Sequence, residues 1–81
     1  MFYPELSKKI SIALKKDPFK YRLEMNSKGF VPIKQLLYSI REKENFATLQ
    51  MYDIYHVAKN LDKGKYEIIG DKIRALDNEG R

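Results

Sequence analysis

The feature that most constrains the fold is an amphipathic segment near the start of the chain that stops at a proline. Its apolar residues recur at the i, i+4, i+7 and i+8 spacing of one helical stripe: Leu6, Ile10, Ala13 and Leu14. Because proline disfavours a helical conformation at the residue before it, Asp17-Pro18 ends the segment. The pattern predicts a first helix over about residues 5–16, with one face buried and the other in solvent.

The outward face of this helix concentrates the positive charge of the chain. At about 100° per residue, four lysines lie opposite the apolar stripe: Lys8, Lys9, Lys15 and Lys16. Residues 1–22 hold six basic and two acidic side chains, so this segment contributes four of the five net positive charges. A concentrated basic surface favours a polyanion as partner, with RNA or DNA leading, although a solvated lysine face gives the same pattern.

Ile12 lies in the middle of these four lysines. Single exposed apolar residues are common on protein surfaces, and we expect Ile12 to be one of them. The alternative is that Ile12 contacts a partner.

A short turn-and-strand segment follows the first helix. Leu23 and Met25 alternate with polar residues, as in an extended stretch, and the Asn-Ser-Lys-Gly sequence of residues 26–29 predicts a turn. Residues 30–31 then predict a brief strand.

Two further helices are expected. Pro32 suits the first position of a helix that extends to about Glu44, with four apolar residues facing inward: Ile33, Leu36, Leu37 and Ile40. The third helix is predicted from Ala47 or Thr48 to about Asn60. Its apolar stripe consists of Met51, Ile54, Tyr55, Ala58 and Leu61.

The last element is predicted to be a β-hairpin. Residues 62–64 resemble a turn, and two β-prone runs, 65–69 and 72–76, flank the two-residue connection Gly70-Asp71. The order helix, short strand, helix, helix and hairpin is that of a winged helix. We therefore expect one α+β, mainly helical domain spanning the chain, with frayed ends at about residues 1–5 and 77–81.

Composition excludes several kinds of site. The chain has no cysteine, which excludes disulfides and thiolate metal sites, and its single histidine cannot form a metal cluster alone. No apolar run approaches the length of a membrane span, and the first residues lack a signal-peptide pattern. These features favour an intracellular, cytoplasmic protein without a membrane partner.

Three segments carry motifs in a fixed order. The first has a Leu-Ser-Lys opening and continues to a proline, at Leu6, Ser7, Lys8, Ser11, Leu14 and Pro18. The second has alternating apolar residues and a glycine–aromatic–valine step, at Leu23, Met25, Gly29, Phe30 and Val31. The third has an Asp-Lys-Gly sequence at residues 62–66 and an Ile-Arg-Ala ending at Ile73, Arg74 and Ala75. Together these segments resemble the N-terminal lobe of the RNA 2′-phosphotransferase family.

This resemblance implies a function in tRNA processing. Members of the family remove a 2′-phosphate from RNA and transfer it to NAD, which binds in a C-terminal lobe. In the family, an Arg-His pair closing the first helix faces the substrate phosphate. Lys15-Lys16 stands at that place here, and lysine lacks the planar fork with which arginine holds a phosphate. The family's Gly-His-Ser does not follow Ala75. We expect no catalytic residue, no cofactor and no phosphotransferase activity in this chain alone.

The candidate binding residues follow from charge and from the resemblance. Those expected to contact nucleic-acid phosphate are Lys8, Lys9, Lys15, Lys16, Lys65 and Arg74. Phe19 and Tyr21 adjoin the basic face and are candidates for stacking on bases. The outward face predicted for the third helix is poor in arginine and makes sequence-specific DNA reading the less favoured interpretation: Gln50, Asp53, His56, Lys59 and Asn60.

Three hypotheses remain open from the sequence. The chain is a non-catalytic module that binds nucleic acid, RNA in preference to DNA. Alternatively, it is an excised or degenerate N-terminal lobe that works only with a C-terminal catalytic lobe. The third hypothesis is a protein-interaction module that docks a partner through Ile12 and its neighbours.

Overall fold

The computed structural model describes residues 2–61 and 63–76. In order, it contains α1 (Phe2–Ser11) continued by a π-helical turn η1 (Ile12–Lys16), β1 (Val31–Pro32), α2 (Ile33–Lys43), α3 (Met51–His56) continued by a π-helical turn η2 (Val57–Leu61), and the hairpin β2 (Tyr66–Ile69) and β3 (Lys72–Ala75). The residues described thus form a mainly helical α+β fold, which confirms the predicted class and is compatible with a winged-helix-like arrangement. The predicted frayed tail, 77–81, lies outside the described residues.

The first helix buries the stripe that its spacing predicts. Leu6, Ile10, Ala13 and Leu14 are all buried in the common core. The helix starts at Phe2 rather than near Glu5, so residues 2–5, expected to fray, form its first turn. Pro4 is tolerated in that turn because the first four N–H groups of a helix have no partner within it.

The end of this helix departs from α-helical geometry. The N–H of Asp17 donates to the carbonyl of Ile12 at 3.0 Å, the five-residue step of a π-turn. A wider turn changes the direction in which successive side chains point. Ile12, expected to be exposed among the lysines, is partly buried and packs against the core.

The loop after the first helix is fixed by Tyr21. Its side chain is buried, its hydroxyl donates to Glu44 Oε2, and its carbonyl accepts from Ser39 Oγ at 2.5 Å. The Lys9 ammonium lies 3.1 Å from Glu44 Oε1. Burial and the bond to Glu44 raise the pKa of Tyr21 to about 12. Tyr21 therefore joins the loop to α1 and α2, and its ring, predicted as a candidate for stacking on bases, is buried in this structure.

The turn at residues 26–29 forms as expected. The side-chain oxygen of Asn26 accepts from the N–H groups of Lys28 and Phe30 at 2.9 and 3.0 Å. Gly29 has φ of 90°, a conformation that favours glycine. Residues 23–26, which alternation predicted to be extended, form no strand in the part of the chain that is described.

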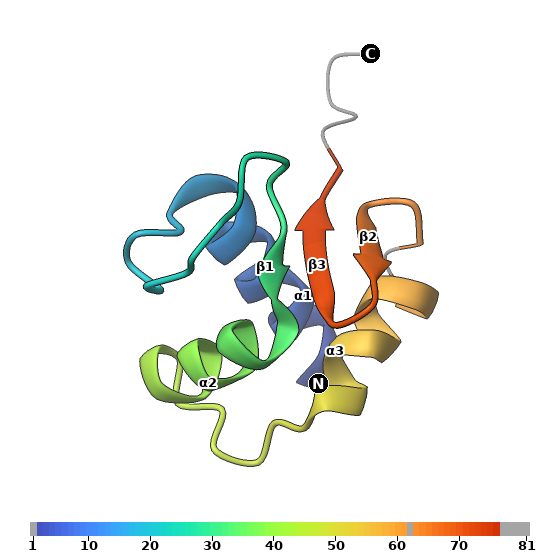
Figure 1. The fold of residues 1–81 in the computed structure, drawn as a ribbon. Coiled ribbons are helices and arrows are strands. Elements are labelled where there is room, and N and C mark those ends of the chain that lie inside the picture. Colours follow the sequence, from blue (N-terminus) through green and yellow to red (C-terminus); the bar gives the residue numbers. More distant parts are fainter. Residues whose placement is uncertain (1, 62, 77–81) are drawn as a thin grey trace.

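The sheet is small and antiparallel, in the order β1-β3-β2. Val31 and Ile68 both pair with Ile73, and the two-residue connection Gly70-Asp71 closes the predicted hairpin. Figure 1 shows β1 leading directly into α2. Pro32 belongs to the strand, with ψ of 133°, so α2 begins one residue later than predicted. Its four predicted apolar residues are buried.

The third helix begins at Met51, three or four residues later than its apolar pattern predicts. A capping box sets this start: the N–H of Gln50 donates to Asp53 Oδ2 at 2.9 Å. The hydroxyl of Tyr3 donates to Asp53 Oδ1, also at 2.9 Å. Asp53, predicted on the outward face, is therefore buried. The π-turn η2 changes the phase of the stripe, so Leu61 is exposed instead of buried.

Tyr21→Phe keeps the buried ring and removes only the hydroxyl. A hydrogen bond to a charged group contributes about 1.5–3 kcal/mol, and we expect the free energy of unfolding near pH 7 to fall by about this amount.

The pKa of Glu44 is lowered from 4.5, mainly by the bond from Tyr21. The stabilisation contributed by the ionised Glu44 carboxylate is fully present above pH 4.5. It is lost as the pH falls through the lowered pKa that Glu44 has in the folded state. Urea unfolding near pH 7 and near pH 3 should show a smaller difference between the two proteins in acid. An equal difference at both pH values would contradict the coupling.

Asp53→Ala removes the cap of α3. Loss of an N-terminal cap costs about 1 kcal/mol, and the bond from Tyr3 is lost as well. Asp71→Ala is the matched control, since the Asp71 side chain is 85% exposed. Chemical unfolding should show a clear loss of stability for Asp53→Ala and almost none for Asp71→Ala. Similar small losses would mean that the cap does not stabilise the fold.

Candidate nucleic-acid interface

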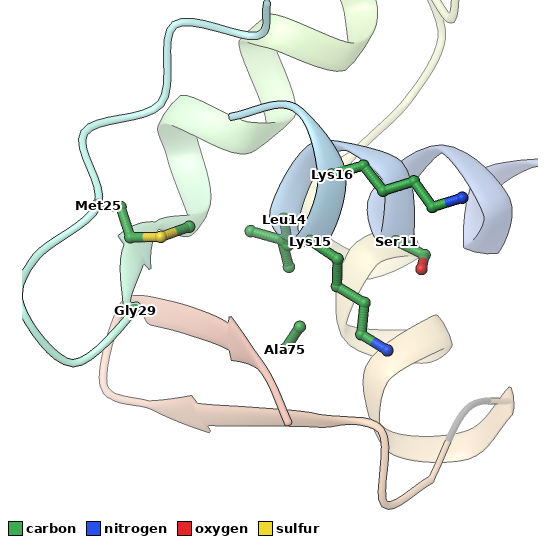
Figure 2. Close-up of a pocket in the computed structure, with 7 residues that line it drawn as sticks. All are labelled: Ser11, Leu14, Lys15, Lys16, Met25, Gly29 and Ala75. Carbon is green, nitrogen blue, oxygen red and sulfur yellow. The ribbon is translucent and has the colours of Figure 1, made fainter. Parts of the chain in front are cut away.

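A groove with a cavity volume of about 600 Å³ lies between the end of the first helix and the sheet. Among the described residues, seven line it: Ser11, Leu14, Lys15, Lys16, Met25, Gly29 and Ala75. Figure 2 shows that they come from the helix end, from the loop before β1 and from the end of β3. The groove therefore joins three segments that are far apart in the sequence.

Two lysines give the groove its chemical character. In Figure 2, the side chain of Lys15 extends from the helix end toward Ala75, whereas that of Lys16 extends along the helix in another direction. Both residues are exposed. Each ammonium carries three N–H donors and no acceptor, which suits the oxygens of a phosphate. The described lining residues include no carboxylate. An anion bound in the groove would have the Lys15 and Lys16 side chains in its lining.

The rest of the lining is mostly apolar. Leu14, Met25 and Ala75 supply carbon surface next to the ammonium groups, and Ser11 adds a hydroxyl. Gly29 allows the loop to turn at the rim because it takes a positive φ; a Cβ there would meet nothing within 4 Å. The groove thus combines cations with an apolar floor, as sites for phosphate-bearing organic ligands do.

The π-turn explains why Lys15 and Lys16 are placed at the groove. They are the last two residues of η1, which directly contacts β3. The sequence predicted them on the same solvent face as Lys8, and this prediction assumed α-helical geometry for the whole segment. Lys8 is exposed on α1, and Lys9 is engaged with Glu44. The structure therefore divides the predicted lysine face into a pair at the groove and a pair farther along the helix.

Arg74 lies on the opposite face of the sheet from the groove. Adjacent strand residues point to opposite faces, and it is Ala75 that lines the groove. The guanidinium of Arg74 contacts Glu67 Oε1 through Nε at 2.8 Å and Nη2 at 2.6 Å, and donates to the carbonyl of Lys28 at 3.0 Å. It also lies 4.8 Å from the centre of the Phe30 ring. The structure thus gives Arg74 a role in holding the turn against the sheet.

The other predicted residues are dispersed. Lys65 is exposed in the turn before β2. Phe19 is 92% exposed, as a stacking residue would need to be, whereas Tyr21 is buried. The sequence reasoning gave Ser11 and Met25 no binding role. Both had been quoted as matches to the family pattern, and that was the available signal.

The side chain of the single histidine packs against neighbouring side chains of the fold. His56 packs against Tyr3, with ring centres 4.5 Å apart, and its Nδ1 lies 3.3 Å from the Asn60 side-chain nitrogen. Among the described residues, no group of three or more His, Asp or Glu side chains could hold a metal ion. None of the helices described is long and apolar enough to cross a membrane.

Comparison with known proteins relates this chain to a known family. Residues 4–80 match the sequence profile described as "RNA 2′-phosphotransferase, Tpt1 / KptA family". A probable RNA 2′-phosphotransferase of Acetivibrio thermocellus is 40% identical over 74 residues, which cover 91% of this chain and 41% of the relative. One from Pyrococcus horikoshii is 34% identical over 71 residues, covering 88% of this chain and 39% of the relative.

The chain spans about two fifths of the length of the curated relatives that it matches. The family profile nevertheless covers almost all of this chain, and the segments that carry the resemblance contribute the lining of one groove. This chain belongs to the RNA 2′-phosphotransferase family.

Proposed function

We propose that this chain binds the phosphates of RNA in the groove between the end of the first helix and the sheet. The observation that carries the proposal is the convergence of the family segments. Lys15 and Lys16 come from the first, Gly29 from the second and Ala75 from the third, and all line the same groove. A packing role alone would not require the two exposed lysines at their meeting point.

RNA is favoured as the ligand by the family, whose matched relatives are named probable RNA 2′-phosphotransferases. Sequence-specific reading of DNA through α3 and η2 is less favoured, because residues 51–61 contain no arginine. The protein-interaction hypothesis also loses support. It depended on an exposed Ile12, which packs against the core.

Binding and transfer are separate parts of the proposal. The groove supplies positive charge for a phosphate, but its described lining includes no aromatic ring to stack on a dinucleotide and no carboxylate to hold ribose hydroxyls. The lining described therefore does not fit NAD. Phosphate transfer would require further parts of the longer relatives. In this chain, the role of the lysine pair is to position the RNA.

The proposal is tested by fluorescence anisotropy with three labelled ligands. These are plain single-stranded RNA, the same RNA with one internal 2′-phosphate, and duplex DNA, each titrated at several salt concentrations. Tighter binding of the 2′-phosphorylated RNA would show that the groove recognises the family's substrate group. Equal, salt-dependent binding of all three would indicate a general phosphate-binding site. Absence of binding at low salt would refute the proposal.

Lys15→Glu combined with Lys16→Glu should remove most of this binding. Each lost phosphate contact lowers the salt slope for single strands by about 0.7, so the slope should decrease by about 1.4. The control is Lys34→Glu with Lys43→Glu, which makes the same change of charge on two exposed lysines of α2. Both double variants should unfold at nearly the wild-type temperature. Equal weakening by the two pairs would mean that net charge, and not the groove, determines affinity.

A further inference from the structure

A second, smaller hollow adjoins the groove. Its cavity volume is about 260 Å³, and the described residues that line it all have apolar side chains: Pro18, Phe19, Leu23 and Met25. Met25 also lines the groove, so the two hollows share a wall. In Figure 2, Met25 lies on the opposite side of the groove from Lys16. A ligand that leaves the groove past Met25 therefore reaches the smaller hollow.

Phe19 is an unusual residue for this position. Its side chain is 92% exposed, the highest value among the large apolar residues exposed in the described part of the chain. The hydrophobic effect favours burying a phenylalanine, and the buried ring of Tyr21 is only two residues away. The fold thus buries one aromatic ring of this loop and leaves the other in solvent.

The backbone holds Phe19 in place. Its carbonyl accepts from the N–H of Arg22 at 3.0 Å, and the carbonyl of Pro18 accepts from the N–H of Leu23 at 3.0 Å. The N–H of Lys20 donates to the Asp17 carboxylate at 3.1 Å. With Tyr21 anchored in the core, the turn presents the Phe19 ring without a large loss of loop entropy on binding.

The surroundings identify the kind of ligand. The hollow is smaller than the roughly 300–1,000 Å³ of pockets that enclose drug-sized molecules, so it suits one ring system. It continues into a groove lined by Lys15 and Lys16, and Lys20 follows Phe19 directly. An apolar, planar group linked to a phosphate matches this combination of surfaces. A nucleobase of single-stranded RNA is such a group, and stacking on an aromatic ring tolerates any base.

We infer that Phe19 and this hollow form a nucleobase subsite, in which the base next to the phosphate bound by Lys15 and Lys16 stacks on the Phe19 ring. The inference rests on the proposed function, since the groove sets the position of the nucleotide. It adds a recognition element that distinguishes RNA from a simple polyanion.

Phe19→Trp gives a direct readout, because the chain contains no other tryptophan. Single-stranded RNA should quench its fluorescence, while inorganic polyphosphate should bind without quenching. An RNA that is abasic at every position should behave like polyphosphate. Binding of all three without quenching would overturn the subsite but leave phosphate binding intact. Failure of polyphosphate and both RNAs to bind would overturn the proposed function itself.

Phe19→Ala measures the contribution of the ring. Loss of one stacked base should weaken binding of RNA about 5- to 150-fold and leave the affinity for polyphosphate unchanged. Tyr52→Ala is the matched control, since Tyr52 is 68% exposed on α3. It should bind RNA like the wild type. An unchanged RNA affinity for Phe19→Ala, together with loss of self-association in sedimentation, would show that a second copy of the chain occupies the hollow and that the inference is wrong.

Discussion

The arrangement of the groove depends on one partly buried contact, between the hydroxyl of Tyr21 and the carboxylate of Glu44. Glu44 follows α2, Tyr21 belongs to the loop after the first helix, and Lys9 of α1 completes the network. The loop that carries Met25 and Gly29 starts immediately after this anchor. Because the network is largely shielded from water, its loss would leave polar groups without partners. The groove therefore exists only while two helices and a loop are held together.

The elements predicted well are those whose local pattern is unambiguous. Four apolar residues at helical spacing defined the first buried stripe, and another four defined that of α2. The hairpin followed from two β-prone runs around a glycine turn. In each case the spacing of apolar residues determines which face can be buried, and no distant contact competes with it.

The errors have two physical causes. The start of α3 was misplaced because a capping box formed by Gln50 and Asp53 ends the preceding loop later than the apolar pattern suggests. Ile12 and Leu61 were assigned to the wrong environments because both lie in π-turns, where the rotation per residue differs from that of an α-helix. Nothing in the spacing of apolar residues reveals such a turn in advance.

For the candidate site, the sequence identified the charges but not the partners of each side chain. Lys15 and Lys16 were singled out, and the structure places them at one groove. Arg74 was grouped with them, yet strand register sets it opposite Glu67, on the other face of the sheet. Tyr21 and Phe19 are two residues apart and of the same chemical type. Tyr21 is buried with its hydroxyl bonded to Glu44, which is distant in the sequence, whereas Phe19 is exposed.

The π-turn at the end of the first helix makes the number of residues in that segment as important as their identity. Deleting one residue between Ile12 and Lys16 would let the helix close with the ordinary four-residue step. The Asp17 N–H could still bond to the Ile12 carbonyl, so the residues after the deletion would keep their direction. However, Ala13, Leu14 or Lys15 would be lost from the core or from the groove. The π-turn thus fits one residue more between Ile12 and Asp17 than an α-helical turn would.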